Sequence, residues 1–366
     1  MKKKRFIIPH RWRWIQNNRG IALFLTLSIV SLITIISMTL HRRSRDFLSF
    51  ASAHRDRLTR VEMSSSGIHT AMSILARDKA LTTADSIQED WANPQFLSTI
   101  TDQFSFEDGR VSITISDEMG KIQINALVKY PEGRHFNELQ KELWLRLLTS
   151  LKDQSGIQEG FEAESILNAV KDWLDFGDGD AISGINGAES AYYLALTPPY
   201  SSRNGSMVQL SEIVLVKGIG PDLLNRLGGI RGVSNYLTVF GAVPSNNGSF
   251  TFEGKVNINT ASLPILTSLL PPSDQILAKF IDDYRRETAG SKFIHDLSDP
   301  AWYRKVPGCG DLKIDPGMMT ISSDVFRIES TAELNGIKTT TIAVIIREKE
   351  ESTDRWTCKV LSWEVL

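Results

Sequence analysis

The sequence predicts an α+β protein in which one long N-terminal helix and an antiparallel sheet are interrupted by a large all-helical insertion domain. Three observations predict this fold class. An uncharged apolar run opens a helical pattern that extends over residues 21–78. Segments that alternate as strands do lie near residue 115 and again after residue 325. Helical segments occupy the chain between them, so the sheet would form from two distant parts of the sequence.

The composition is that of an ordinary globular protein with one basic end. The 366 residues are 42% hydrophobic and 23% charged, which excludes a disordered or collagen-like chain. Seven basic side chains and no acidic one lie in the first 20 residues. Removing these seven from the 41 basic residues leaves 34 against 43 acidic residues, a net charge of −9. So acidic a body disfavours sequence-independent binding to nucleic acid, which depends on neutralising phosphates.

Residues 21–40 contain no charge, glycine or proline, and a helix of that length spans about 30 Å, the thickness of a bilayer core. Three interpretations are open. A cleaved secretory signal needs a small-residue site just after the run, but charged residues separate the Ala-Ser-Ala triplet at 51–53 from it. A permanent signal anchor is the second interpretation. In the third, the chain is cut before the run, between Gly20 and Ile21.

A charged leader that ends in Gly20 and leads directly into an apolar run resembles the start of type IV prepilins and pseudopilins. The resemblance implies that a prepilin peptidase removes residues 1–20 and that the new Ile21 amine is methylated. Residues 21–40 would remain as a single-pass anchor in the bacterial inner membrane, with the globular part in the periplasm. Most family members have glutamate at the fifth mature position, where this chain has Leu25. Among type II secretion pseudopilins, this departure is typical of the K-type minor subunit.

The chain after the apolar run divides into three further segments. Residues 41–134 continue the helix and then contain two alternating stretches, RVSITIS at 110–116 and KIQINAL at 121–127, which are predicted to form a hairpin. Residues 135–315 have the periodicity of helices joined by loops. Residues 316–366 return to strand character and would complete the sheet.

The turn and second strand, DEMGKIQINAL, resemble a segment of the K-type pseudopilins, and the resemblance extends over nearly the whole chain. It implies a pilin-like fold whose insertion is similar to SAM and helix-hairpin-helix domains. It also implies a minor pseudopilin at the tip of the pseudopilus, in complex with the I and J minor pseudopilins and above the major pseudopilin. There it would initiate assembly, support export of folded proteins across the outer membrane and contact secreted proteins. A minor type IV pilin is a close alternative.

The densest acidic cluster lies at residues 171–193, where four aspartates fall within nine residues. These carboxylates repel one another unless they are solvated or neutralised by a cation. A solvated Asp/Gly turn is one interpretation. The other is calcium binding, which is implied because DWLD and GAESAYY resemble the calcium-binding segment of the K-type pseudopilins. The ligand candidates are Asp175, Asp178, Asp180 and Glu189, with Asp172 as a weaker candidate one helical turn earlier.

Two segments raise an alternative function, a membrane-anchored DNA-uptake protein. VKGIGPDLLNRL (216–227) and KVNINTASLPILTSLL (255–270) resemble the two halves of a helix-hairpin-helix motif. That motif contacts phosphates through backbone amides, with help from nearby Lys or Arg. Here the halves stand in reversed order, about thirty residues apart, with few basic residues beside them. We therefore favour a tight helix–helix turn at GIG and a helix cap at the Asn-Thr pair.

The sequence does not indicate catalysis. It contains no HExxH, GxSxG, Walker, GxGxxG or CxxC motif, and its six histidines are scattered. We therefore predict a protein without catalytic residues.

The only two cysteines are Cys309 and Cys358. They could form a disulfide if the globular part faces the periplasm, because that compartment is oxidising. Two unpaired buried thiols are the alternative.

Overall fold

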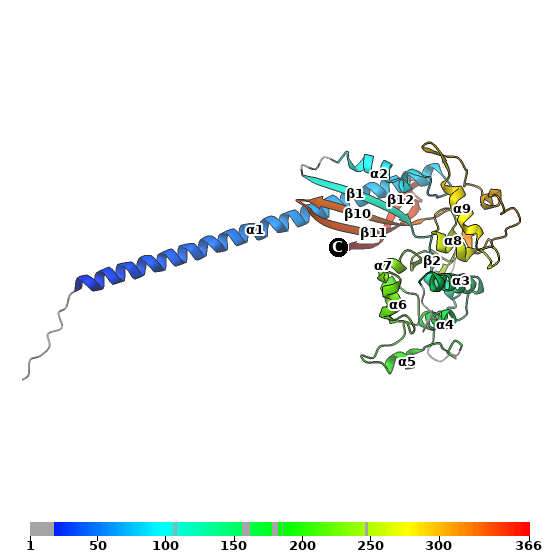
Figure 1. Cartoon of the computed structure of the whole chain (residues 1–366), viewed down its shortest axis with the longest axis horizontal. Helices are drawn as coiled ribbons and strands as arrows, with labels where there is room; N and C mark the ends of the chain where they lie inside the picture. Colours follow the sequence, from blue (N-terminus) through cyan, green and yellow to red (C-terminus); the bar gives the residue numbers. More distant parts are fainter. Residues whose placement is uncertain are drawn as a thin grey trace, which may run out of the picture. The chain divides into compact units, whose positions relative to one another are not determined.

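The computed structural model describes residues 18–104, 106, 108–155, 162–177, 182–184, 186–245 and 248–366. The chain divides into two compact units, residues 1–59 and residues 60–366. The 64-residue helix α1 (Asn18–Leu81) contributes to both (Figure 1). The predicted long helix over residues 21–78 is therefore confirmed, with three more residues at each end.

In the first unit, α1 is exposed at every position from Gly20 to Arg55. Its apolar part is long enough to cross a bilayer, and within the described residues no other helix meets that criterion. Thr34 and Thr39 donate hydrogen bonds to the carbonyls of Val30 and Ile35, four residues earlier, at 2.8 and 2.7 Å. These hydroxyls are therefore satisfied within the helix, as a lipid environment requires.

A four-stranded antiparallel sheet forms in the second unit, in the order β1-β10-β11-β12 (Figure 1). Its strands are β1 (Gly109–Asp117), β10 (Val325–Leu334), β11 (Ile337–Glu350) and β12 (Arg355–Val365). The predicted strand at 110–116 and the strand character predicted for residues 316–366 are thus confirmed. Because β1 pairs directly with β10, everything between these two strands is an insertion into one sheet.

The sheet core forms between the last turns of α1 and one face of the sheet. Ile68 and Leu75 of α1 are fully buried against the inward residues of β1 and β10, with α2 (Pro94–Thr101) and the 3-10 helix η1 (Asp90–Ala92) at the side. α1 comes close to β10 at Gly67, where a Cβ would overlap the Ser330 hydroxyl. A glycine is needed there for this close approach.

The predicted hairpin between 110–116 and 121–127 is wrong. β2 (Ile122–Gln123) pairs in parallel with β3 (Leu237–Thr238), and η2 (Ile124–Leu127) is a 3-10 helix. Every residue from Lys121 to Val128 is buried, whereas a hairpin strand with one solvated face would alternate. The segment therefore leaves the sheet after Asp117 and enters the core of the insertion.

The insertion is mainly helical. Its α-helices are α3 (Glu138–Ser155), α4 (Ala163–Leu174), α5 (Ser190–Leu194), α6 (Pro221–Arg226), α7 (Gly229–Val233), α8 (Leu263–Leu269) and α9 (Leu277–Arg286). It also contains the 3-10 helices η3 (Leu210–Leu215) and η4 (Trp302–Lys305).

Four two-stranded pairs accompany these helices, which the prediction of an all-helical insertion lacked. Besides β2–β3 they are β4–β5 (Ala242–Pro244, Phe250–Phe252), β6–β9 (Val256–Asn257, Met319–Thr320) and β7–β8 (Thr288–Ala289, Lys292–Phe293). Strands of two or three residues are too short to show an alternating pattern in the sequence.

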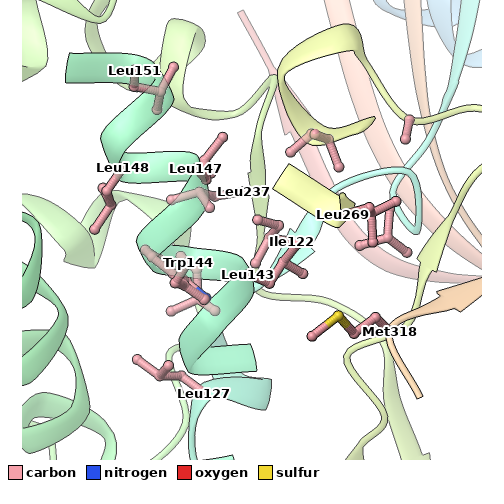
Figure 2. Packing of buried hydrophobic residues seen from close by; sticks show 14 of the residues in the cluster. Ile122, Leu127, Leu143, Trp144, Leu147, Leu148, Leu151, Leu237, Leu269 and Met318 are labelled. Carbon is pink, nitrogen blue, oxygen red and sulfur yellow. The ribbon is translucent and has the colours of Figure 1, made fainter. Parts of the chain in front are cut away.

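A single apolar core holds the insertion together (Figure 2). Leu143, Trp144 and Leu147 of α3 are buried at its centre, and α3 and α8 pack against each other. This core runs from Ile122 to Met319 and is a different cluster from the core under the sheet. The second unit therefore contains two apolar cores, and a polar network that reaches both is described below.

Candidate metal centre

Three buried carboxylates meet where α4 ends and α5 begins. Asp172 lies in the last turn of α4, Asp175 follows that helix directly, and Glu189 precedes α5. One oxygen from each lies within 4.8 Å of the others, and the three residues are 0%, 1% and 5% exposed. Acidic side chains are seldom buried to this degree unless they are paired or bind a cation.

The local structure explains why the two aspartates lie together. Asp175 comes three positions after Asp172, and this i, i+3 spacing places both on one face of a helix. The Asp175 backbone N–H donates to the Lys171 carbonyl at 2.9 Å and closes the last turn of α4. Its φ and ψ of −75° and 159° are extended, so the chain turns away from the helix axis immediately after the site.

Two described residues before α5, Ser183 and Gly187, lie against Asp172. The Ser183 backbone N–H lies 3.1 Å and 3.2 Å from the two carboxylate oxygens of Asp172 and donates to them. A Cβ at Gly187 would overlap both the Asp172 carboxylate and the Ser183 carbonyl. Only glycine allows the backbone to pass this close, so Gly187 is a steric requirement of the site.

Lysines supply the positive charge near the three carboxylates. Lys171 forms an ion pair with Asp175, and its ammonium lies 3.8 Å from Asp172 Oδ1. Lys217 donates to the Gly187 carbonyl at 3.2 Å and lies over the Tyr192 ring. Its ammonium therefore contacts the backbone and an aromatic ring next to the site. Three carboxylates this close together repel one another, and a divalent cation would reduce that repulsion.

Aromatic residues cover the α4 side of the site. The Trp173 and Tyr193 rings meet edge to face at 5.1 Å, and the Lys217 backbone N–H donates to the Tyr193 hydroxyl at 3.2 Å. Burial raises the pKa of Tyr193 above its usual value, so this hydroxyl stays neutral. Aromatic rings beside the three carboxylates lower the local dielectric constant, which strengthens the electrostatic interactions of these carboxylates.

The donor set fits a hard divalent cation. Calcium binds carboxylate and carbonyl oxygens at about 2.3–2.6 Å, so two ligands on opposite sides of the ion lie about 5 Å apart. The three carboxylate oxygens all lie within 4.8 Å of one another, which is inside that limit. The cluster contains no histidine or cysteine, which are the ligands that zinc prefers.

The structure brings together two of the predicted ligands, Asp175 and Glu189. Asp178 and Asp180 lie outside the described residues. Asp172, the weaker candidate from the sequence, is the most deeply buried of the three. The i, i+3 spacing of Asp172 and Asp175 on the predicted helix was the signal that should have ranked them equally.

A second acidic group, Asp78, Asp85 and Glu89, lies at the end of α1. Arg347 pairs with both aspartates, and Lys79 lies 3.7 Å from Asp85 Oδ2. Two cationic side chains therefore lie beside these aspartates, and the group is part of a polar network.

The two cysteines are separate free thiols. Cys309 is part of the insertion core, while Cys358 on β12 packs beside the sheet core and donates to the Met72 carbonyl at 3.4 Å. They belong to different cores and are not bonded to each other in this structure; Cys309 is buried and Cys358 is half-buried.

The segments that resemble a helix-hairpin-helix have structural roles. The GIG turn leads into α6, and Lys217 beside it is engaged with Gly187 and Tyr192. In the second segment, Asn257 and Thr260 are bonded to Asp117 of β1. A helix cap at the Asn-Thr pair is not what forms, because α8 has Ser262 at its N-cap position.

The described fold is that of a pilin-like subunit: an apolar helix of membrane-spanning length continues into a helix packed on an antiparallel sheet, and a helical domain is inserted into that sheet. Residues 120–230 match the family model for "Type II secretion system (T2SS), protein K". This region contains all the candidate ligands. Over this region the chain is thus similar to type II secretion system protein K, in agreement with the resemblance drawn from its sequence.

Curated relatives extend the match along the chain. Type II secretion system protein K of Aeromonas hydrophila is 30% identical over 126 residues, 34% of this chain and 37% of that protein. The protein K of Pectobacterium carotovorum is 30% identical over 57% of this chain and 61% of its own length. The match to the Pseudomonas aeruginosa protein K covers 76% of this chain and 75% of that protein, at 25% identity. The chain thus spans less than two thirds of the first two relatives.

A solved structure has the same fold. It is a chain from the GspK-GspI-GspJ complex of the enterotoxigenic Escherichia coli type 2 secretion system, with a TM-score of 0.58 and 17% identity. The match covers 86% of this chain and 99% of that one.

Proposed function

We propose that this chain is a minor pseudopilin of a type II secretion system, anchored in the bacterial inner membrane with residues 60–366 in the periplasm. The observation that carries the proposal is α1. One continuous helix provides an apolar half of membrane length and then the helix that is buried on the sheet. Such a helix can remain in the bilayer and still belong to a folded subunit. The relation to protein K supports the same role.

A second feature of α1 supports assembly with other subunits. Phe47, Ala51, His54 and Leu58 follow a four-three-four spacing, which places them on one face of the helix. All four are exposed, and Phe47 is 70% exposed. We call these four residues the apolar seam, since all but His54 are apolar. Exposed residues with this spacing are suited to packing against another helix. We infer that α1 binds the corresponding helices of neighbouring pseudopilins.

The insertion supports a place at the tip of the pseudopilus. It occupies the whole chain between Asp117 and Val325, far more than a strand connection needs. A subunit of this bulk fits best where no other subunit lies above it. Leu25 supports the same position, since a first subunit has no preceding N-terminal amine for a glutamate to pair with. We infer that the chain caps a complex with I- and J-type minor pseudopilins above the major pseudopilin, and so initiates assembly for export.

Co-purification from membranes tests this role. The full-length chain is expressed with the I- and J-type pseudopilins and the prepilin peptidase of the same secretion system, and then solubilised in detergent. We expect a complex that contains all three pseudopilins. The proposed role is contradicted if the chain purifies alone while the I- and J-type subunits still bind each other.

We further infer that Asp172, Asp175 and Glu189 hold a calcium ion that stabilises the insertion. Calcium would reduce the repulsion among these carboxylates and fix the loop between α4 and α5. Asp172 would also orient that loop through its bonds to the Ser183 N–H. We infer a structural role, because apolar and aromatic side chains surround the described part of the site.

Removal of the metal tests this inference in the full-length protein in detergent. Dialysis against EGTA should lower the melting temperature by about 5 °C or more, and added calcium should restore it. Asp172→Asn should abolish the response to calcium. Asp283→Asn, which changes an exposed aspartate of α9, should leave the response intact. An equal response in the Asp172 variant would place calcium elsewhere.

A further inference from the structure

Two sequence segments that resemble family motifs contact each other in the structure. The first is the turn after β1, at residues 117–121, and the second is the NINTA segment at residues 257–261. Asn257 Nδ2 lies 2.9 Å from Asp117 Oδ2, and the Thr260 hydroxyl donates to the same oxygen at 2.6 Å. The Asn257 backbone N–H also donates to the Met119 carbonyl at 2.8 Å.

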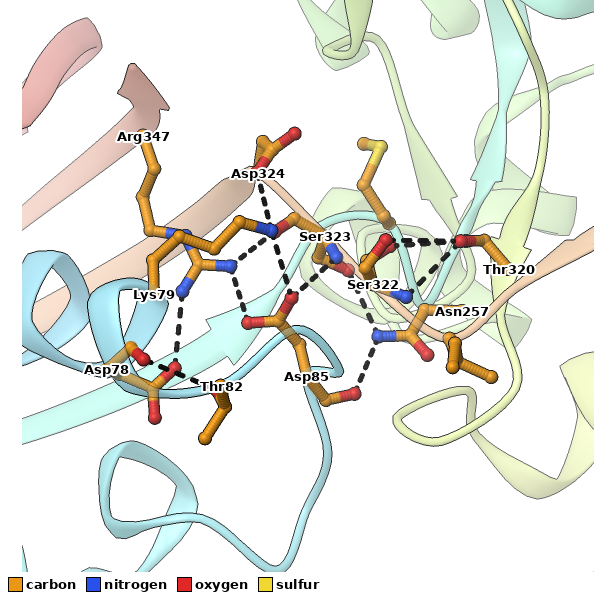
Figure 3. Close-up of polar contacts among 12 residues, drawn as sticks. Asp78, Lys79, Thr82, Asp85, Asn257, Thr320, Ser322, Ser323, Asp324 and Arg347 are labelled. Carbon is orange, nitrogen blue, oxygen red and sulfur yellow. Dashed lines mark hydrogen bonds and ion pairs between the residues drawn. The ribbon is translucent and has the colours of Figure 1, made fainter. Parts of the chain in front are cut away.

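Ser323 and Asp85 complete the inner part of this network (Figure 3). The Ser323 hydroxyl donates to Asp117 Oδ2 at 2.6 Å, and its backbone N–H donates to Asp85 Oδ2 at 2.8 Å. Asn257 Nδ2 reaches the Asp85 carbonyl oxygen at 3.0 Å. All four residues are less than 8% exposed.

Arg347 of β11 connects this inner part to the end of α1. Its guanidinium bonds to the Asp85 carboxylate and the Ser323 carbonyl, and it pairs with Asp78 of α1 at 3.3 Å (Figure 3). Lys79 of α1 adds an ion pair to Asp324 at 3.0 Å. The interdomain junction, as we name Asp78, Asp85, Asp117, Asn257, Thr260, Ser323 and Arg347, therefore reaches from the last turn of α1 to the insertion.

The interdomain junction lies between two apolar cores that are separate clusters. Apolar packing within each core does not fix how one core is oriented on the other. Hydrogen bonds to a buried carboxylate do fix this orientation, because each bond requires a particular distance and angle. Asp117 is the central acceptor: it belongs to the sheet, and two of its donors, Asn257 and Thr260, belong to the insertion.

We propose that the interdomain junction couples the helical insertion to α1 and the sheet, so that the two cores unfold as one cooperative unit with a fixed relative orientation. Removing a donor from the insertion side would leave Asp117 buried with fewer partners, which is costly because a buried charge must be hydrogen-bonded. The two cores would then unfold at different temperatures. This proposal concerns the chain itself and does not depend on its proposed place in a secretion complex.

The test follows each core separately in the full-length protein in detergent. Hydrogen exchange with mass spectrometry, recorded along a temperature series, gives a melting midpoint for peptides from α8 and another for peptides from β10. In the wild-type protein we expect the two midpoints to coincide. Asn257→Ala should separate them by about 5 °C or more.

Asn259→Ala is the matched control. Asn259 is also a buried asparagine, but its side chain bonds to Leu297, Ile321 and Trp302, away from Asp117. This variant should lower both midpoints together, because the coupling remains. Wild-type midpoints that already differ, or coincident midpoints in Asn257→Ala, would overturn the proposal.

A milder variant covers the case in which Asn257→Ala does not fold. Thr260→Val keeps the side-chain shape and removes one hydroxyl that donates to Asp117. It should separate the two midpoints by a smaller amount, about 2 °C. Midpoints that move together in Thr260→Val, as in the Asn259 control, would count against the proposal.

Discussion

At the residue scale, Asp78 shows how charge is held at the end of α1. Burial and, to a smaller extent, the neighbouring Glu89 and Asp85 carboxylates raise the pKa of Asp78 from 3.8 to about 7, against the opposing effect of Arg347. Burial likewise raises the pKa of Glu89. Native Asp78 therefore keeps its proton up to about pH 7, whereas the unfolded chain releases it near pH 4. Between about pH 4 and pH 7 the native state therefore binds more protons than the unfolded chain does.

This difference predicts a stability that falls as pH rises between about 4 and 7. In Asp78→Asn the amide imitates the protonated acid, so this contribution to the pH dependence disappears. Relative to the variant, the wild-type free energy of unfolding should fall by about 1 to 2 kcal/mol from pH 5 to pH 8. Denaturant titrations of the full-length protein in detergent at each pH measure it.

The control for this prediction is Asp283→Asn, which changes an exposed aspartate paired with Lys279. Its unfolding free energy should run parallel to that of the wild type across the same pH range. If Asp78→Asn also ran parallel, the proton would not be held at Asp78.

The sequence could predict the region of the candidate metal centre but not its exact residues. Asp175 and Glu189 could be named because DWLD and GAESAYY resemble the calcium-binding segment of the K-type pseudopilins. The density of carboxylates alone left a solvated turn equally open. The central place of Asp172 depends on a backbone N–H from Ser183, eleven residues later. Loop closure of this kind is set by tertiary structure and leaves no periodic signal in the sequence.

At the element scale, prediction succeeded where one face of an element is solvated. β1 and β10 alternate because one face of each packs on α1, and α1 itself is long and strongly patterned. The 121–127 segment was predicted incorrectly because its alternation of isoleucines imitates a strand, although every residue in it is buried. A fully buried short segment cannot be assigned from periodicity alone.

The apolar seam on α1 gives a prediction for this element. Phe47→Glu places a charge in the seam, while Ser49→Glu places one about 200° away around the same helix. Burial of a phenylalanine side chain in an interface contributes about 1.5–3 kcal/mol of binding free energy. Its loss should reduce capture of the I- and J-type partners about tenfold or more. Quantitative co-purification from membranes measures this capture.

In the same experiment, Ser49→Glu should retain capture close to that of the wild type. Both variants should keep the melting temperature of the globular part, because both positions are exposed. Equal loss in the two variants would show that charge near the membrane matters and that the seam does not.

At the scale of the whole molecule, the α+β class and the order of sheet, helical insertion and sheet could be predicted, since each segment has its own periodicity. The joining of the two cores could not. Asn257 bonds to Asp117, 140 residues earlier, and no local pattern relates the two positions. The resemblance of both segments to family motifs showed that they are distinctive, but only the structure shows that they contact each other.

The central claim is that the apolar half of α1 remains attached to the folded body and becomes the membrane part of an assembled subunit. The most direct test is the N-terminal residue of the protein isolated from membranes of cells that contain its prepilin peptidase. The account predicts a chain that begins at a methylated Ile21, and an uncleaved chain when the peptidase gene is deleted. A mature chain that keeps Met1 in the presence of the peptidase, or one that begins after the apolar run at His54, would contradict it.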